Sequence, residues 1–185
     1  MRYLVQALVG LALAITGVQV QALELTPADC TVAYPCYQGI TPNNPDAADV
    51  SSIVGVTVEE YYKQDVGAGS DVGEFAGSYN TTFDNSPTDP ADATITYVPG
   101  TTALTCPECF LLIKDGNQDP IWYIFDIGDT WNGTDTITLT GFWPNQGAIS
   151  HVSLLGAPGQ VPEPGPLALL AIGLLAVGMR KLKKA

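Results

Sequence analysis

The sequence predicts a mainly β protein whose central region folds as an antiparallel β-sandwich or jelly roll. Two observations lead to this prediction. Short runs rich in β-branched and aromatic residues recur along the chain, and turns of Gly, Asn, Pro and Asp separate them. No long amphipathic helix pattern precedes Leu167. Regularly spaced short strands with such turns are typical of all-β sandwiches and barrels.

The first part of the central region combines irregular backbone with strands. Residues 23–49 show little periodicity and are expected to be irregular. Glu59–Val66 could form a short helix, but the Gly-rich turn that follows favours a strand. A loop rich in Pro and Asp is expected at 84–92. The strands expected in this part are Ile53–Val58, Glu59–Val66, Phe75–Phe83 and Ala93–Val98.

The second part of the central region has a clearer pattern of strands and turns. Turn residues occur at 115–117, 129–133 and 144–147. The expected strands are Phe110–Lys114, Ile121–Ile127, Thr136–Phe142 and Ala148–Leu155. Together these strands predict one domain over residues 23–157, which is long enough to bury a sizeable core.

Residues 1–22 have the layout of a secretory signal peptide. Arg2 supplies the positive start, Leu4–Val18 is mostly apolar, and Val20 and Ala22 place small residues at the cleavage positions. A retained membrane anchor is the alternative, but the apolar core is shorter than the roughly 20 residues that a spanning helix needs. We therefore expect cleavage after Ala22 and export.

The C-terminal residues predict a linker at 158–166 and a single transmembrane helix with a basic tail at 167–185. The apolar run Leu167–Met179 is short for a membrane span, but Lys and Arg side chains can extend to the membrane surface. A buried core helix is the alternative, which a cationic chain end disfavours. The basic tail predicts a cytoplasmic C-terminus. Its cations are Arg180, Lys181, Lys183 and Lys184.

The order of a Pro-Glu-Pro motif, an apolar run and a basic tail resembles the PEP-CTERM sorting signal. Pro162, Glu163 and Pro164 match that motif residue by residue. The resemblance implies a protein exported by a Gram-negative bacterium that makes extracellular polysaccharide. It also implies that an exosortase in the inner membrane recognises the motif and that the anchor is then removed. It covers about the last 25 residues and implies no enzymatic activity, since proteins with this tail differ widely in their exported regions.

The region 23–157 is strongly acidic. It holds eighteen of the nineteen Asp and Glu residues but only two of the seven Lys and Arg residues, which gives a net charge of −16. This charge disfavours nucleic acid as a partner, because nucleic-acid binding depends on cationic side chains. Solubility and repulsion between copies are one explanation, and attraction for divalent cations or a cationic matrix is another. No cofactor and no resident metal are expected.

The four cysteines predict disulfides, because they are an even set in an exported chain. Local bridges and bridges that tie the N-terminal segment to the rest of the domain are both compatible with the sequence. The C-x-x-C pair could also be a redox or metal site, but it leads into a predicted strand rather than a helix, which favours a structural disulfide. The cysteines are Cys30, Cys36, Cys106 and Cys109.

Two acidic loops are weak candidates for a calcium site. Asp115, Asn117 and Asp119 supply oxygens at alternating positions, as the first half of an EF-hand loop does. Pro120 stands where that loop needs Gly, so an EF-hand is excluded. A turn capped by Asp and Asn side chains is the other interpretation. The second loop offers Asp84, Asn85, Asp89 and Asp92.

Catalytic chemistry has less support. Paired carboxylates could hydrolyse a glycoside, yet the spacing of the glutamates selects no pair. His151 is the only histidine, and its neighbour Ser150 should point to the opposite face of a strand, so no Ser–His nucleophile is expected. The glutamates considered are Glu59, Glu60, Glu74 and Glu108.

The aromatic residues bear on glycan binding. Exposed rings could stack on sugars, but in a β-sandwich most of them are expected in the core. We therefore predict a non-catalytic component of the cell surface or the extracellular polysaccharide matrix. The alternatives are an exported polysaccharide-active enzyme of the glycoside hydrolase type and a calcium- or glycan-binding module. The rings considered are Tyr97, Trp122, Tyr123, Trp131 and Trp143.

Overall fold

The computed structural model describes residues 22–31, 35–67, 71–86, 88–106, 108–116, 118–144 and 147–158. The predicted signal peptide lies outside these residues except for Ala22. The sorting motif, the predicted transmembrane helix and the basic tail also lie outside them. Within the described ranges, no helix has the length and hydropathy of a membrane span.

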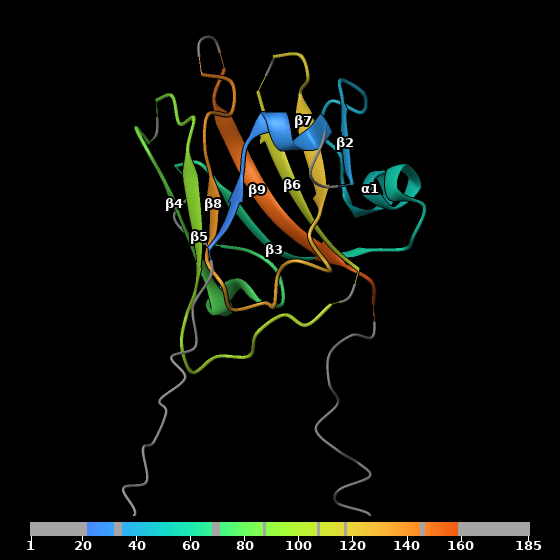
Figure 1. Ribbon diagram of the computed structural model, residues 1–185, viewed down its shortest axis with the longest axis vertical. Helices are drawn as coiled ribbons and strands as arrows, with labels where there is room; N and C mark the ends of the chain where they lie inside the picture. Colours follow the sequence, from blue (N-terminus) through green and yellow to red (C-terminus); the bar gives the residue numbers. More distant parts are fainter. Residues whose placement is uncertain are drawn as a thin grey trace, which may run out of the picture.

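Two sheets make up the described part of the chain (Figure 1), which confirms the mainly β prediction. The four-stranded sheet runs in the order β1 (Leu23–Leu25), β8 (Ile137–Leu139), β5 (Ala93–Tyr97), β4 (Tyr79–Phe83). The five-stranded sheet runs in the order β2 (Cys36–Gly39), β7 (Trp122–Asp126), β6 (Cys109–Asp115), β9 (Ile149–Gly156), β3 (Glu59–Asp65). Neighbouring strands are antiparallel, except that β1 and β8 are parallel.

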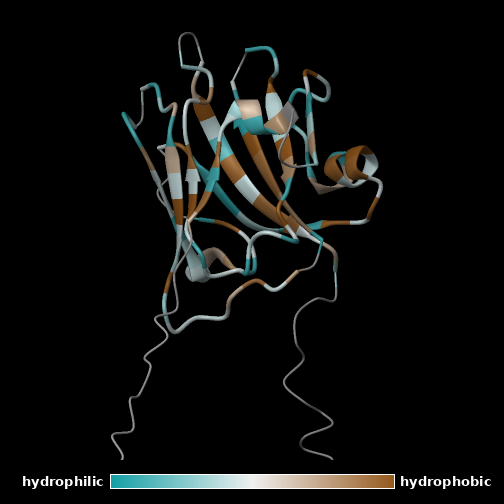
Figure 2. Cartoon of the chain, viewed as in Figure 1, coloured by the Kyte–Doolittle hydropathy of each residue, from teal (hydrophilic) through white to brown (hydrophobic). Residues whose placement is uncertain are grey.

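The main core lies between the two sheets. Ile95 and Leu139 from the four-stranded sheet and Leu111, Ile113 and Leu154 from the other sheet belong to one buried cluster. Figure 2 shows hydrophobic residues alternating with more polar ones along β9. Successive side chains of a strand point to opposite faces, so Val152 and Leu154 enter this core while His151 and Ser153 lie on the other face of the sheet. An aromatic group fills the same core, with Phe142 packed edge-on against Tyr123 and Phe125.

Helix α1 (Ala47–Val54) covers part of the outer face of the five-stranded sheet. Val50 packs there against outward-facing residues of β6, β7 and β9. Because both faces of this sheet are covered, every residue of the central strand β6 is buried. The residues packed in this second cluster are Val50, Val58, Phe110, Leu112, Trp122, Ile124 and Leu155.

Three sequence predictions were wrong. Ile53–Val58 is not a strand, because α1 extends to Val54 and ends at Gly55, whose φ is 82°. At the start of α1, Asp46 and Asp49 form a reciprocal capping box, which satisfies free amides of the first turn. Residues 75–78 form a turn and a 3₁₀ helix, η2 (Ala76–Ser78), and only the rest of the predicted Phe75–Phe83 strand is extended.

The third error concerns residues 23–49, which are more ordered than expected. They contain β1, a 3₁₀ helix η1 (Pro27–Thr31), β2 and the start of α1. The parallel pairing of Leu23–Leu25 with β8 supplies a partner that local sequence does not reveal. The remaining predicted strands are confirmed, with boundaries at most three residues away from those expected, and Glu59–Asp65 is a strand rather than a helix.

Candidate functional site

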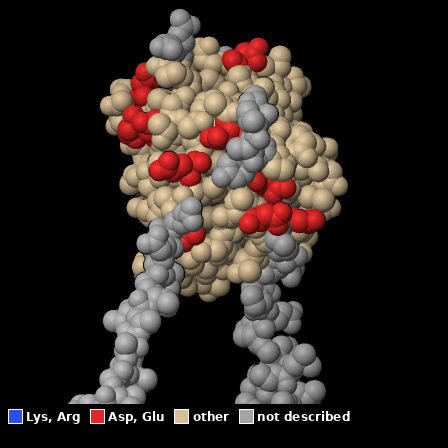
Figure 3. Space-filling model, viewed as in Figure 1, with Lys and Arg blue, Asp and Glu red and all other residues tan. Residues whose placement is uncertain are grey.

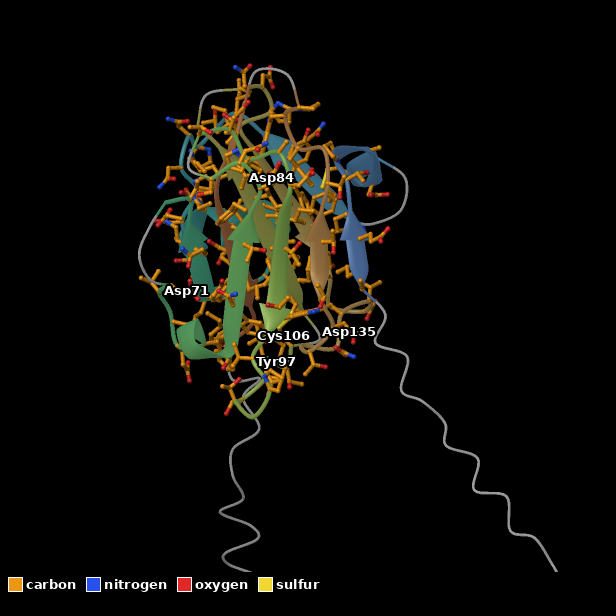
Figure 4. All side chains as sticks on the ribbon, turned by 90° about the vertical axis from the view of Figure 1, so that its left-hand side faces the viewer. Asp71, Asp84, Tyr97, Cys106 and Asp135 are labelled. Carbon is orange, nitrogen blue, oxygen red and sulfur yellow. A yellow bond between two sulfur atoms is a disulfide. The ribbon has the colours of Figure 1, made fainter. Side chains whose placement is uncertain are left out.

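Three connecting loops meet at one end of the domain, the upper end in Figure 1. They are the β4–β5 loop, the β6–β7 turn and the segment before β9. A cavity of about 470 Å³ lies between them, with Asp89, Asp115, Gln118 and Ser150 in its lining. Figure 4 places Asp84 at this end and Cys106 at the opposite end. The structure thus brings the two acidic loops considered for calcium to one cavity.

Asp115 connects two of these loops. Its carboxylate accepts hydrogen bonds from the amide of Gln118 (3.0 Å) and the amide of Ala148 (2.7 Å). The side chain is only 2% exposed. A Cβ atom at Gly147 would clash with this carboxylate, so glycine lets the segment before β9 approach it closely. Asp115 therefore has a structural role that is sufficient to explain its presence.

The calcium interpretation of these loops stays a prediction. Asp119 is exposed, and Asn117 lies outside the described residues. In the β4–β5 loop, Asp84 accepts from the amide of Asp92 (2.8 Å), and Asp92 accepts from the amide of Gly141 (2.7 Å). Within the described ranges, no three His, Cys, Asp or Glu residues are grouped to hold a metal ion.

A second polar region occupies the outer face of the five-stranded sheet, beside the area that α1 covers. The strand register places Lys114 of β6, His151 of β9 and Asp65 of β3 in one row across the sheet. In the next row, Ser153 of β9 lies opposite Lys63 of β3. Paired residues point to the same face, so these five side chains form one group, which we call the outer polar group.

The outer polar group contains both lysines and the only histidine of residues 23–157. His151 Nδ1 lies 3.6 Å from Asp65 Oδ1, and Lys63 Nζ lies 3.5 Å from the same oxygen. Lys114 is 7% exposed, and its ammonium group donates a 2.6 Å hydrogen bond to the main-chain oxygen of Asp115. The sequence shows that residues 23–157 contain only two lysines, Lys63 and Lys114. It does not show that the fold brings these two lysines close to His151.

Burial lowers the pKa of two members of the outer polar group, His151 and Lys114. Burial, together with the positive charges of Lys63 and Lys114, lowers the pKa of His151 to about 4, although Asp65 opposes the shift. Burial also lowers the pKa of Lys114. His151 is therefore neutral at pH 7. Ser150 does not face it, because Ser150 Oγ donates to the main-chain oxygen of Lys114 (3.1 Å).

The three tryptophans are buried in the core rather than exposed as a platform on which sugar rings could stack. Trp122, Trp131 and Trp143 are 4%, 5% and 9% exposed. Each indole N–H donates to the main-chain oxygen of a connecting loop, at Pro42 (3.0 Å), Asp135 (2.8 Å) and Pro120 (2.7 Å) respectively. Tyr123 is also buried, and Tyr97 is half-buried. These tryptophans therefore fix loops to the core and leave little aromatic surface for sugars.

The glutamates considered for hydrolysis lie at the surface. Glu59 and Glu60 begin the edge strand β3, and all four candidates are exposed. A general acid in a glycosidase needs a protected setting that raises its pKa. Exposed positions do not provide that setting. The four are Glu59, Glu60, Glu74 and Glu108.

The cysteines form the two local bridges, Cys30–Cys36 and Cys106–Cys109. Their Cα–Cα distances are 4.8 Å and 5.2 Å. Cys106 and Cys109 are 6% and 1% exposed, whereas a dithiol catalyst needs an accessible sulfur. Cys106 contacts the end of β9, where a Cβ at Gly156 would lie 3.1 Å from its sulfur. The second bridge therefore supports the last strand of the domain.

Acidic side chains dominate the surface. Figure 3 shows several separate groups of Asp and Glu on one face and no described Lys or Arg there. This distribution accords with the net charge of −16 for residues 23–157. A surface of this charge favours repulsion between copies of the domain.

Comparison with known proteins identifies the C-terminal segment. A family model described as the PEP-CTERM protein-sorting motif matches residues 160–184. The match includes Pro162, Glu163, Pro164 and the basic tail, and it confirms the resemblance drawn from the sequence. The motif implies export, a membrane-anchored C-terminus before processing, and processing by an exosortase. No curated protein and no solved structure matches the chain.

Proposed function

We propose that this chain, which carries the PEP-CTERM motif, is a non-catalytic component of the cell surface or of the extracellular polysaccharide matrix of a Gram-negative bacterium. The single observation that carries the proposal is the motif match at 160–184. In this proposal a signal peptide exports the chain, and the C-terminal helix holds it in the inner membrane. An exosortase then recognises Pro162-Glu163-Pro164, and the processed domain moves to the surface or the matrix.

Three features of the domain support a structural rather than a catalytic role. The tryptophans are buried with their N–H groups bonded to loops. The buried carboxylate of Asp115 is bonded to two backbone amides. The long acidic side chains considered for hydrolysis are exposed. These features favour a stable, soluble body over a cleft with paired acids.

The end of the domain is well suited to present a sorting motif. The amide of Ala157 donates to the main-chain oxygen of Glu108 (3.2 Å), and the Tyr61 hydroxyl donates to the oxygen of Ala157 (3.3 Å). These bonds and the contact of Cys106 with Gly156 hold the chain up to the start of the predicted linker. The matched segment begins three residues after Ala157. The motif therefore follows directly after a fixed anchoring point.

Replacing Glu163 by Ala is expected to leave the chain unprocessed in the membrane fraction, because the variant lacks the central residue of the motif. The measurement is the intact mass of the protein under non-reducing conditions, from hosts with and without the exosortase. The unaltered chain should begin near Leu23, lack the C-terminal anchor and weigh four hydrogens less than the fully reduced form.

The control for this experiment is Glu24→Ala, which removes an exposed acid of β1 far from the motif in sequence. This variant should be processed like the unaltered chain. Normal release of Glu163→Ala, or a full-length C-terminus of the unaltered chain in both hosts, would contradict the sorting proposal.

A calcium- or glycan-binding module is the second candidate function. The cavity that joins the β4–β5 loop to the β6–β7 turn favours it, since Asp89 and Asp115 both line this cavity. If the module binds calcium, Ca²⁺ should raise the melting temperature, because a ligand that binds only the folded state stabilises it. Asp89→Asn should abolish the rise, whereas Asp129→Asn, in an exposed loop at the opposite end, should not. An unchanged melting temperature would reject calcium binding and leave the sorting proposal intact.

A further inference from the structure

We propose that one end of the domain, the end from which the chain leaves after Ala157, docks against the exosortase during processing. We call this surface the exit face and define it by the exposed side chains of Glu59 and Glu108 and by half-buried Ala157. Glu59 pairs with Gly156 across β3 and β9, and the main-chain oxygen of Glu108 accepts from Ala157, so these residues are neighbours. The inference rests on the proposed function, because it depends on recognition of residues 162–164 by the exosortase.

The chain leaves the exit face from a fixed point. The amide of Ala157 donates to the main-chain oxygen of Glu108 (3.2 Å), and the Tyr61 hydroxyl donates to the oxygen of Ala157 (3.3 Å). The preceding residue, Gly156, packs so closely on Cys106 that a Cβ atom there would lie 3.1 Å from the sulfur. Local fraying of the last strand therefore adds little to the reach of the segment that follows Ala157.

The path along the chain from the exit face to the sorting motif is short. Pro162 comes five residues after Ala157, and five residues span at most about 18 Å. A domain of this length has a radius of gyration of about 14 Å, which corresponds to a sphere about 37 Å across. An enzyme that binds Pro162, Glu163 and Pro164 therefore lies close enough to touch the exit face.

The link to the membrane is also short compared with the size of the domain. The predicted transmembrane helix begins at Leu167, ten residues after Ala157, which allows at most about 36 Å of extended chain. If the domain were inverted, this chain would have to pass around a body about 37 Å across, a path longer than its full extension. The exit face therefore turns toward the membrane. The opposite end, with the cavity of about 470 Å³, turns away from it.

The N-terminal strand supports the same orientation. The amide of Leu23 donates to the main-chain oxygen of Thr136 (2.8 Å), next to Asp135. Figure 4 shows Asp135 at the same end of the domain as Cys106, whereas Asp84 lies at the other end. The predicted signal peptide, before its cleavage, and the predicted membrane anchor therefore both connect to the end that carries the exit face.

The charge of the exit face favours a protein partner over lipid. Glu59 and Glu108 are exposed there, whereas Lys114 lies near the other end of β6 and Lys63 lies further along β3. Anionic lipid headgroups repel carboxylates. A cationic or uncharged surface of the exosortase does not, so the enzyme rather than the lipid surface is the partner that fits this face.

The test is photocrosslinking of the full chain in a host that has the exosortase, with p-benzoyl-L-phenylalanine in place of Glu108 or Glu59. The matched control carries it in place of Asp119, an exposed acid of the β6–β7 turn at the opposite end. Glu108 and Glu59 positions should crosslink to the exosortase at least about tenfold more than the Asp119 position, because the linker cannot bring the far end to the enzyme. Adding Glu163→Ala should abolish these crosslinks, since the motif brings the enzyme to the domain.

A longer linker tests the geometric argument directly. An insert of about 20 Gly and Ser residues after Pro158 adds up to about 70 Å of reach, so crosslinking from the Asp119 position should rise toward that from the Glu108 position. The intact mass of each variant establishes whether it is processed.

Two kinds of failure are distinguishable. If the chains are processed but crosslink equally from both ends, crosslink only to lipid, or give no crosslink from the Glu108 and Glu59 positions, the exit face is not the docking surface and the sorting proposal stands. If no chain is processed in the host with the exosortase, the proposed function fails and this inference fails with it.

Discussion

Replacing Gly133 by alanine is expected to lower the free energy of unfolding by about 2–5 kcal/mol. Gly133 lies in the loop between β7 and β8 with a φ of +83°, a left-handed conformation that costs a residue with a Cβ atom about 1–2 kcal/mol. A Cβ atom at this position would also overlap the main-chain oxygen of Leu104. Overpacking of this kind adds about 1–3 kcal/mol, because backbone must move to relieve it.

Replacing Gly133 by alanine should also disturb both hydrogen bonds of the Tyr79 hydroxyl. Tyr79 donates to the oxygen of Gly133 (2.9 Å) and accepts from the amide of Leu104 (2.8 Å), so it bridges the two loops that the new methyl would push apart. The Tyr79 ring packs against Tyr62 and Trp131 with centroids 5.6 Å and 5.7 Å away. Burial raises the pKa of this tyrosine to about 12, as expected for a phenol within the core.

The matched control is Gly100→Ala. Gly100 has a similar positive φ of +91°, but a Cβ atom there would meet no atom within 4 Å. Chemical denaturation of both variants would therefore separate the cost of the backbone conformation from that of the contact with Leu104. Equal losses of stability would show that the Gly133–Leu104 contact contributes nothing, and so would contradict this account.

The fold shows which sequence signals are local and which are not. Strands such as β6 and β7 were predictable because a single apolar run with turns at both ends determines them. Helix α1 was missed because its β-branched residues resemble a strand, although Asp46, Asp49 and Gly55 carried a capping signal at both ends. Strand β1 depends on its parallel neighbour β8, more than a hundred residues later, which no local pattern reveals.

The same distinction between local sequence patterns and contacts of distant segments applies to the candidate sites. Burial of the tryptophans was expected from their chemistry, and the structure confirms it. The outer polar group was not predictable, because it depends on the order β6-β9-β3 and on register across two ladders. A single histidine in the sequence carried no sign that Lys63 and Lys114 flank it. The sorting motif is a linear pattern that can be read from the sequence, whereas the outer polar group exists only after folding.

Acidification should weaken the fold through His151. Its pKa is about 4 in the folded protein and 6.5 in an unfolded chain, because burial disfavours the charged ring and the two lysines repel it. As the pH falls below 6.5, the unfolded chain binds a proton that the folded chain accepts only near pH 4. The free energy of unfolding should thus decrease over this interval, by about 2 kcal/mol between pH 7 and pH 5.

The charged groups around His151 determine how this dependence is measured. Asp65 and Lys63 face it from β3, Lys114 faces it from β6, and Glu60 and Asp46 line the adjoining cavity. All of them remain in His151→Gln, so subtracting the pH dependence of this variant from that of the unaltered chain isolates the imidazole. Denaturation should be followed at both pH values in the same buffer and at the same ionic strength. If the free energy of unfolding of both chains falls equally between pH 7 and pH 5, His151 is not the acid-sensitive group. If it falls only in the unaltered chain, His151 is the residue whose protonation destabilises this domain.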